Sequence, residues 1–189
     1  MAVGLVGVVL CCVPSVIFFG RFPGGEQFSE LYVLGPTHMA EGYPFNVSAG
    51  RNYSVYLGVG NHLGNVTYYR VVVKLRNGDE ALPNSTTGVA SPLPALYNYS
   101  VFLTDGQVWE DSLVFSFPNV LFEGNVSSLQ WVSINGALFV VDKSAVWDNE
   151  NNGYFYQLFM ELWVFDSTSS SFNFHSRFVA LWLNVTQSF

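Results

Sequence analysis

The first twenty residues constrain this chain most, because they carry no charged side chain and therefore decide which solvent surrounds the rest. About 19 of them, counted from Met1, form an apolar run that would be roughly 28 Å long as a helix. The hydrocarbon core of a bilayer is about 30 Å thick. The run therefore predicts a transmembrane helix over residues 1–20, followed by a short Gly- and Pro-containing tether over residues 21–27.

Two alternatives remain open for this run. A cleaved secretory signal has a similar apolar length, but it normally opens with Lys or Arg and closes on small residues, whereas residues 18–23 read FFGRFP. A buried core helix is the second alternative. Cys11 and Cys12 are the only cysteines and lie inside the run, so the remainder of the chain can form neither a disulfide nor a thiolate metal site.

Sequons for N-glycosylation are far more frequent than chance predicts. Ser and Thr make up about a seventh of the chain, so its fifteen asparagines would form roughly two Asn-x-Ser/Thr sequons at random. Seven are present, and none has proline at x: Asn46, Asn52, Asn65, Asn84, Asn98, Asn125 and Asn184. The excess indicates an exported surface that carries glycans, and it outweighs the weak opposite signal of Arg21 at the end of the apolar run.

Composition narrows the class of protein further. About 165 residues follow the apolar run, enough for one domain with a substantial core. Charged residues make up only 11% of the chain and aromatic residues 17%, a balance that favours sheets over helices. The seven Lys and Arg residues are scattered and the formal net charge is −7, which argues against a nucleic-acid partner.

Alternating apolar and polar residues predict antiparallel strands along the whole outer part. The expected strands cover residues 28–34, 52–60, 66–75, 97–103, 108–117, 120–122, 129–134, 137–141, 154–165 and 172–184. Asn135-Gly136 gives the strongest hairpin signal. A long loop with three prolines separates the third and fourth of these strands. The last two strands form one long hairpin with apolar residues on both faces, so it is expected either at the centre of a sandwich or with one face awaiting a partner.

Several stretches together carry a family resemblance: FSELYVLGP at residues 28–36, GYP at 42–44 before the Asn46 sequon, VGNH at 59–62, DGQVW at 105–109 and RFVALW at 177–182. The chain resembles the C-terminal outer domain of an archaeal membrane-protein family known only as domain of unknown function 1616. The resemblance implies an immunoglobulin-like sandwich over residues 28–189, preceded by the last of several transmembrane helices. It implies no activity and no catalytic residues.

Candidate sites are few. Asp148, Glu150 and Asn152 place oxygen side chains at alternate positions before a glycine, as at the start of a calcium loop, but Phe159 stands where the bidentate ligand would be. A plain polar turn is the alternative. The five tryptophans could include a platform that stacks on sugars, although core packing accounts for most of them. No Gly-x-Ser-x-Gly elbow is present, so we expect no enzyme and no cofactor other than calcium.

These observations predict an all-β domain, anchored in the cell membrane and facing outside, that acts as a non-enzymatic, N-glycosylated interaction module. Its expected partners are the membrane, the glycans themselves and either a surface protein or further copies of the chain. A secreted subunit that assembles into filaments or a surface layer by strand donation is the alternative. A domain that binds calcium or carbohydrate is a further one.

Overall fold

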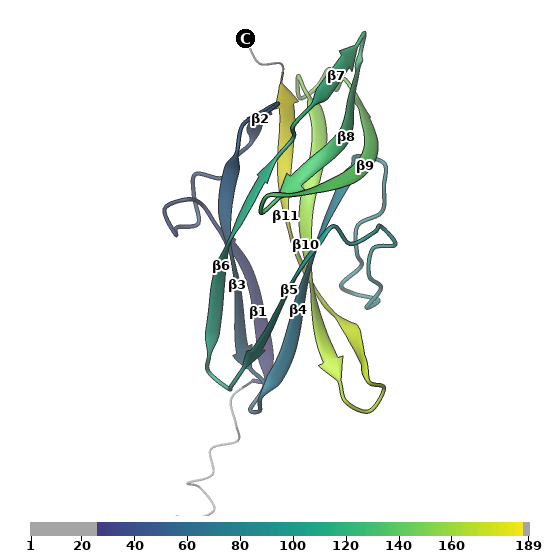
Figure 1. Ribbon diagram of the computed structural model, residues 1–189. Coiled ribbons are helices and arrows are strands. Elements are labelled where there is room, and N and C mark those ends of the chain that lie inside the picture. Colours follow the sequence, from purple (N-terminus) through teal and green to yellow (C-terminus); the bar gives the residue numbers. More distant parts are fainter. Residues whose placement is uncertain (1–25, 187–189) are drawn as a thin grey trace, which may run out of the picture.

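The computed structural model describes residues 26–186, and this part of the chain is all-β (Figure 1). The predicted transmembrane helix and most of the tether lie outside the described residues. Within residues 26–186, no helix has the length and apolarity of a membrane span. The strands are β1 (Phe28–Leu34), β2 (Asn46–Ser48), β3 (Tyr53–His62), β4 (Thr67–Asn77), β5 (Tyr97–Leu103), β6 (Val108–Ser116), β7 (Val120–Glu123), β8 (Val126–Ile134), β9 (Ala137–Val146), β10 (Tyr154–Asp166) and β11 (Ser171–Thr186).

The strands form two sheets. In the first, which we call sheet A, the order is β1-β3-β6-β8-β7, with β9 paired to β8. In the second, sheet B, the order is β2-β11-β10-β4-β5. All neighbours are antiparallel except β2 and β11, which run parallel through three residue pairs. The chain therefore changes sheets between β1 and β2.

One hydrophobic core lies between the inner faces of the two sheets. Sheet A contributes Val55, Leu57 and Val59 of β3 together with Leu113 and Phe115 of β6. Sheet B contributes the alternate residues of β4, β10 and β11 that face them, Tyr69, Val71, Val73, Leu75, Tyr156, Leu158, Met160, Leu162, Leu183 and Val185. The apolar residues that alternate along each strand thus lie on one side of it and face the common core.

All ten predicted strands are present in the predicted order, and there are three local differences. Strand β2 was missed because three residues are too few to display an alternation. Strands β8 and β9 are longer than predicted because their pairing shifts between Leu129 and Trp131, which interrupts the alternation on which the prediction relied. Asp142 lies opposite this shift with a positive φ of 42°, as expected of a β-bulge.

The outer face of sheet B is partly covered, which accounts for the second apolar face predicted for β10. The long loop between β4 and β5 folds back over this face, where Ser91 N–H donates to Glu161 Oε1 (2.7 Å) and Lys74 Nζ donates to Ser91 O (2.7 Å). The Lys74 ammonium also pairs with Glu161. The chain therefore supplies a cover for the middle of this face from its own loop.

The two ends of the domain differ in what they carry. Figure 1 shows the start of β1, the β3–β4 and β5–β6 turns and the β10–β11 hairpin at one end, which we call the lower end. The β7–β8 hairpin and residue 186 lie at the opposite, upper end. The described chain thus enters at one end and leaves at the other.

Candidate functional surfaces

Six of the seven sequon asparagines are exposed: Asn46, Asn52, Asn65, Asn84, Asn98 and Asn125. Two of them lie on the edge strands of sheet B, Asn46 on β2 and Asn98 on β5. An edge strand presents unpaired backbone groups to other chains, and bulky or polar groups on it discourage such pairing. Glycans at these two positions would therefore cover both borders of the sheet.

Asn184 differs from the other six, because it is only 8% exposed. Its Oδ1 accepts a hydrogen bond from Tyr154 N–H (3.1 Å), and its Nδ2 donates to Asn46 Oδ1 (3.0 Å). The amide nitrogen to which a glycan would be joined is thus already engaged inside the fold. The side chain instead ties β11 to the start of β10 and to β2.

In the predicted calcium turn, the Asp148 carboxylate accepts hydrogen bonds from the residues that follow it. Asp148 Oδ1 accepts the backbone N–H groups of Glu150 (2.8 Å) and Asn151 (3.1 Å), while Oδ2 accepts from Asn151 Nδ2 (2.7 Å). These hydrogen bonds hold the pKa of the Asp148 carboxyl below its usual value. The geometry is that of the polar turn considered as the alternative. Calcium binding by Asp148, Glu150 and Asn152 stays a prediction.

The three histidines lie in different surroundings. His38 Nδ1 lies 2.5 Å from Glu110 Oε1, and its ring stacks on Tyr56. The ring of His62 stacks on Phe28. Burial lowers the pKa of His175, and the positive charge of Arg177 lowers it further. Among residues 26–186, no three His, Cys, Asp or Glu side chains come together in a way that could hold a metal ion.

The outer face of sheet A has an aromatic and acidic character. Gly58 lies under the Tyr32 ring, and Gly60 lies under Glu30; a Cβ on either glycine would overlap the side chain above it. Burial raises the pKa of Tyr32, and the nearby carboxylates of Glu110 and Glu30 raise it further. The two glycines of β3 thus provide the space in which these larger side chains pack.

Three of the five stretches that carried the family resemblance, residues 28–36, 59–62 and 105–109, come together on sheet A, whereas residues 177–182 lie on β11 of sheet B. Residues 28–34 pair with 56–62, and the β5–β6 turn packs beside them, with Asn61 N–H donating to Gln107 O (3.0 Å). Asn61 is fully buried. Its Nδ2 donates to Asn65 O and Leu103 O, and its Oδ1 accepts from Tyr69 Oη and Leu63 N–H. Sequence reasoning missed this structural role, because the partners of Asn61 come from three separate segments.

Three of the five tryptophans are half-buried and two are exposed. Trp163 Nε1 donates to Glu161 Oε2 (3.0 Å), Trp109 packs on Tyr99, and Trp147 packs on Tyr154. The other two, Trp131 and Trp182, are 40% and 45% exposed. They lie on different sheets, so the described surface does not join them in one platform.

A groove opens on the side where β1 and β11 face each other. It has a volume of about 540 Å³ and is lined by apolar residues of both strands and of the chain before β2, among them Leu31, Val33, Phe45, Val179 and Trp182. Beyond its pairs with β2 at residues 184–186, β11 borders this groove with no further strand beside it in the described part of the chain.

Comparison with known proteins identifies a family but no activity. The family model described as "Domain of unknown function (DUF1616)" matches residues 23–129. No curated protein sequence matches the chain.

Similar solved structures include a β-glucosidase from Listeria innocua, which is 12% identical with a TM-score of 0.46 over 86% of this chain. The chain spans only 16% of the glucosidase. A structure of the complex between zinc 2-glycoprotein and prolactin inducible protein from human seminal plasma matches over 87% of this chain and 99% of that one, at 9% identity and a TM-score of 0.41. Both TM-scores are below 0.5, too low to indicate a common function.

Proposed function

The chain belongs to the family of the domain of unknown function DUF1616, and from this premise we propose that it is a membrane-anchored, N-glycosylated interaction module of the cell surface, without catalytic activity. The proposal takes residues 1–20 as the anchor and the domain after it as facing outside. The observation that carries it is the exposure of six sequon asparagines, two of them on the edge strands of sheet B. The archaeal membrane setting follows the family resemblance.

We further propose that the fold is an immunoglobulin-like sandwich. The pairing of β1 with β3 in one sheet and of β2 with β11 in the other corresponds to the divided first strand of many such domains. The order β11-β10-β4-β5 is the one expected for the second sheet of such a domain. The segment β7–β9 is then an insertion at the upper end.

Intact-mass measurement and N-terminal sequencing of the protein purified from its native membrane test this function. An uncleaved N-terminus with glycans on several of the six exposed sequons is the expected result. Material that carries no glycan at any sequon would rule out the glycosylated surface module.

A secreted, self-assembling subunit is the second candidate, and the groove between β1 and β11 favours it. A strand supplied by a neighbouring copy could pair with β11 there. This alternative requires cleavage near Gly20. It predicts filaments by negative-stain microscopy and a new N-terminus in the sequencing experiment, where the anchored module predicts neither.

A further inference from the structure

Four aromatic side chains, two of them exposed and two half-buried, form a continuous cluster on the outer face of sheet B at the lower end. Tyr68 stacks on Phe102 with ring centroids 4.0 Å apart and meets Phe172 edge-on at 5.0 Å, while Phe172 also contacts Phe165 at 5.3 Å. Phe102 is 65% exposed, as is the neighbouring Val66. We call Val66, Tyr68, Phe102, Phe165 and Phe172 the aromatic end patch.

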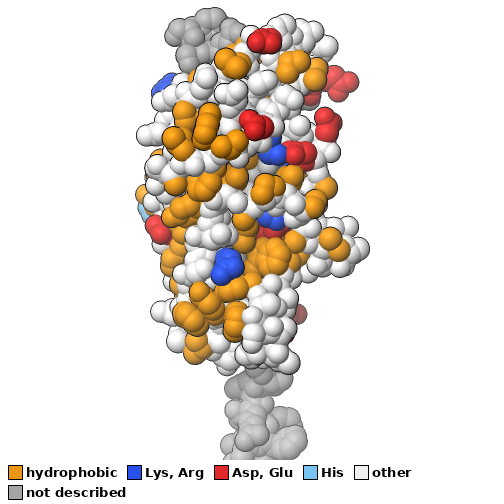
Figure 2. Space-filling model, turned by 45° about the vertical axis from the view of Figure 1, so that its right-hand side comes forward, with side chains coloured by type: hydrophobic (Ala, Val, Ile, Leu, Met, Phe, Trp, Pro, Cys, Tyr) orange, Lys and Arg blue, Asp and Glu red, His pale blue; other side chains and the backbone are white. Residues whose placement is uncertain are grey.

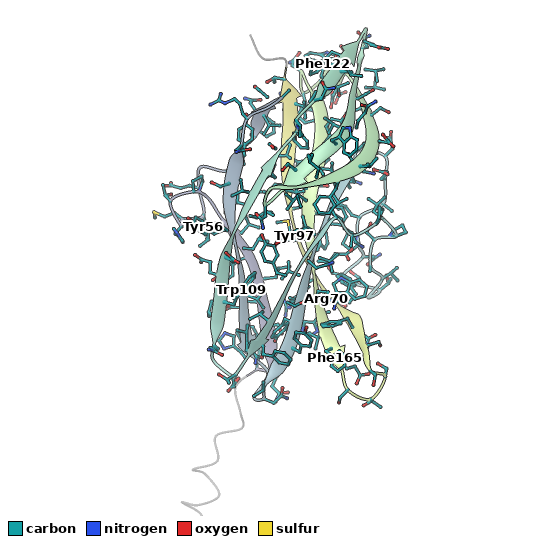
Figure 3. All side chains as sticks on the ribbon, viewed as in Figure 1. Tyr56, Arg70, Tyr97, Trp109, Phe122 and Phe165 are labelled. Carbon is teal, nitrogen blue, oxygen red and sulfur yellow. The ribbon has the colours of Figure 1, made fainter. Side chains whose placement is uncertain are left out.

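A single cation is set among these rings. The Arg70 guanidinium carbon lies 3.8 Å from the centre of the Phe172 ring. Within residues 26–186, no carboxylate lies at ion-pair distance from Arg70, and its buried Nε has no hydrogen-bond partner. Figure 3 labels Arg70 and Phe165 near the lower end, and Figure 2 shows a basic group among hydrophobic side chains toward that end. The patch thus combines exposed aromatic rings with one cation that lacks an anionic partner.

The register of the strands places this patch where the chain enters the domain. Tyr68 pairs with Phe102 one step from the start of β4, and Phe165 pairs with Phe172 next to the turn of the β10–β11 hairpin. The first residue of β1, Phe28, pairs with His62 at the same end. The β4–β5 loop that covers the middle of sheet B leaves Phe102 and Phe165 exposed.

The predicted tether between the apolar run and β1 is short. Residues 21–27 separate the apolar run from Phe28, and seven residues span at most about 25 Å when fully extended. An anchor over residues 1–20 would therefore keep the lower end within that distance of a bilayer surface. None of the sequon asparagines belongs to the patch: Asn98 pairs with Val72, farther up the same face, and Asn65 Oδ1 accepts from Thr67, whose side chain points to the other side of β4.

We propose that the aromatic end patch lies against the interfacial region of the bilayer that holds the anchor, with Arg70 facing the phosphate groups of the lipids. The inference rests on the anchored module proposed above. Aromatic side chains are favoured at the depth of the headgroups, where one side of the ring is apolar and the other is wet. A cation beside them adds attraction to anionic lipid. The domain would then lie tilted on the membrane instead of standing free on its tether.

Spin labels on the full-length chain test the proposal. Cys11→Ala and Cys12→Ala remove the native thiols, and a nitroxide is attached through Val66→Cys in the patch or, as the matched control, through Leu121→Cys on β7 at the upper end. Both native side chains are exposed. The protein is reconstituted into vesicles of phosphatidylcholine and phosphatidylglycerol, and power saturation measures access of each label to oxygen, which concentrates in the bilayer, and to a nickel chelate, which stays in water.

We expect position 66 to favour oxygen and position 121 to favour the nickel chelate. Phe102→Ser together with Phe165→Ser should shift position 66 toward the nickel chelate, while the circular dichroism spectrum and flotation with the vesicles stay unchanged. Equal, water-like access at both positions in protein that floats would overturn the patch proposal but leave the anchor intact.

Two other outcomes also contradict the inference. Exclusion of both reagents from position 66 would mean that protein, such as a second copy of the chain, covers the patch. Failure of the full chain to float with the vesicles would reject the anchor and, with it, the proposed function.

Discussion

Lys74 Nζ lies 2.9 Å from Glu161 Oε2, and both side chains are almost completely removed from water, at 5% and 0% exposure. The pair joins β4 to β10 on the outer face of sheet B. Ser91 donates its N–H to the carboxylate and accepts from the ammonium, so the two charges also fix the long loop. The covering of this face therefore depends on a small buried polar cluster.

Removing only one member of this pair should be costly. Lys74→Met leaves the Glu161 carboxylate buried without its cation, which lowers the free energy of unfolding by about 3–5 kcal/mol. Adding Glu161→Gln to Lys74→Met should restore most of this loss, because the amide oxygen still accepts from Ser91 while the buried charge is gone. Urea denaturation of the two variants measures the difference. The pair of Lys143 with Glu80, whose carboxylate is 29% exposed, serves as the comparison, and Lys143→Met should cost less than Lys74→Met because water reaches the carboxylate that remains. Equal losses in the single and double variants would contradict this account.

Stability should fall in strongly alkaline solution. Burial raises the pKa of Tyr99 from 10.0 to about 12, even though Asn135 donates to its hydroxyl. A pKa that is higher in the folded chain than in the unfolded one contributes stability that is fully present below pH 10 and is lost as the pH rises through 12. The loss amounts to about 3 kcal/mol. Urea denaturation between pH 9 and 12 measures it, and Tyr99→Phe should show a shallower decline over the same range. A variant whose stability falls as steeply as that of the native chain would exclude Tyr99 as the cause.

Gly153 should tolerate no side chain. A Cβ at this buried position would overlap Asn184 Oδ1, the atom that accepts from Tyr154. Gly153→Ala is therefore expected to lower the free energy of unfolding by about 1–3 kcal/mol. Gly78→Ala is the matched control, because nothing lies within 4 Å of a Cβ there. Thermal melting of the two variants should separate them, and similar melting temperatures would mean that Asn184 moves freely.

Asn98 should protect the edge of sheet B. If the proposed glycans are present, Asn98→Gln removes the one on β5 and leaves this edge strand open to pairing with other chains. When both variants are purified from the native host, Asn98→Gln should self-associate more than Asn125→Gln, which removes a glycan from the β7–β8 turn instead. Sedimentation velocity measures the oligomeric fraction. Identical sedimentation of the two variants would show that the edge needs no glycan.

Local patterns in the sequence predicted much of this fold. Ten of the eleven strands follow from alternation and turn residues, because each needs only its own neighbours along the chain. The exception, β2, exists through its parallel pairing with residues 184–186, almost 140 positions away. The cover that the β4–β5 loop forms over sheet B could not be predicted for the same reason. Lys74 and Glu161 are far apart in the sequence, and they form an ion pair only because β4 and β10 are adjacent in the sheet.

The candidate sites follow the same division. Sequons are local motifs, so all seven could be read directly, but the burial of Asn184 depends on residues from β2 and β10. The aromatic end patch was not predicted, because Tyr68, Phe102, Phe165 and Phe172 come from four strands. The high aromatic content of the sequence was the only signal for such a patch. The position of these four side chains at one end depends on how the four strands are aligned with one another.

The change of sheets between β1 and β2 has a mechanical consequence. The described chain enters at the lower end and leaves at the upper end, so a pull between the ends acts along the strands (Figure 1). β1 is held to β3 by seven residue pairs, and β2 is held to β11 by three. Hydrogen bonds between strands run across the pulling direction, so a whole row must be sheared together instead of opening one after another. The first strand, divided between two sheets, thus acts as a clamp against tension at the point where load would enter the domain.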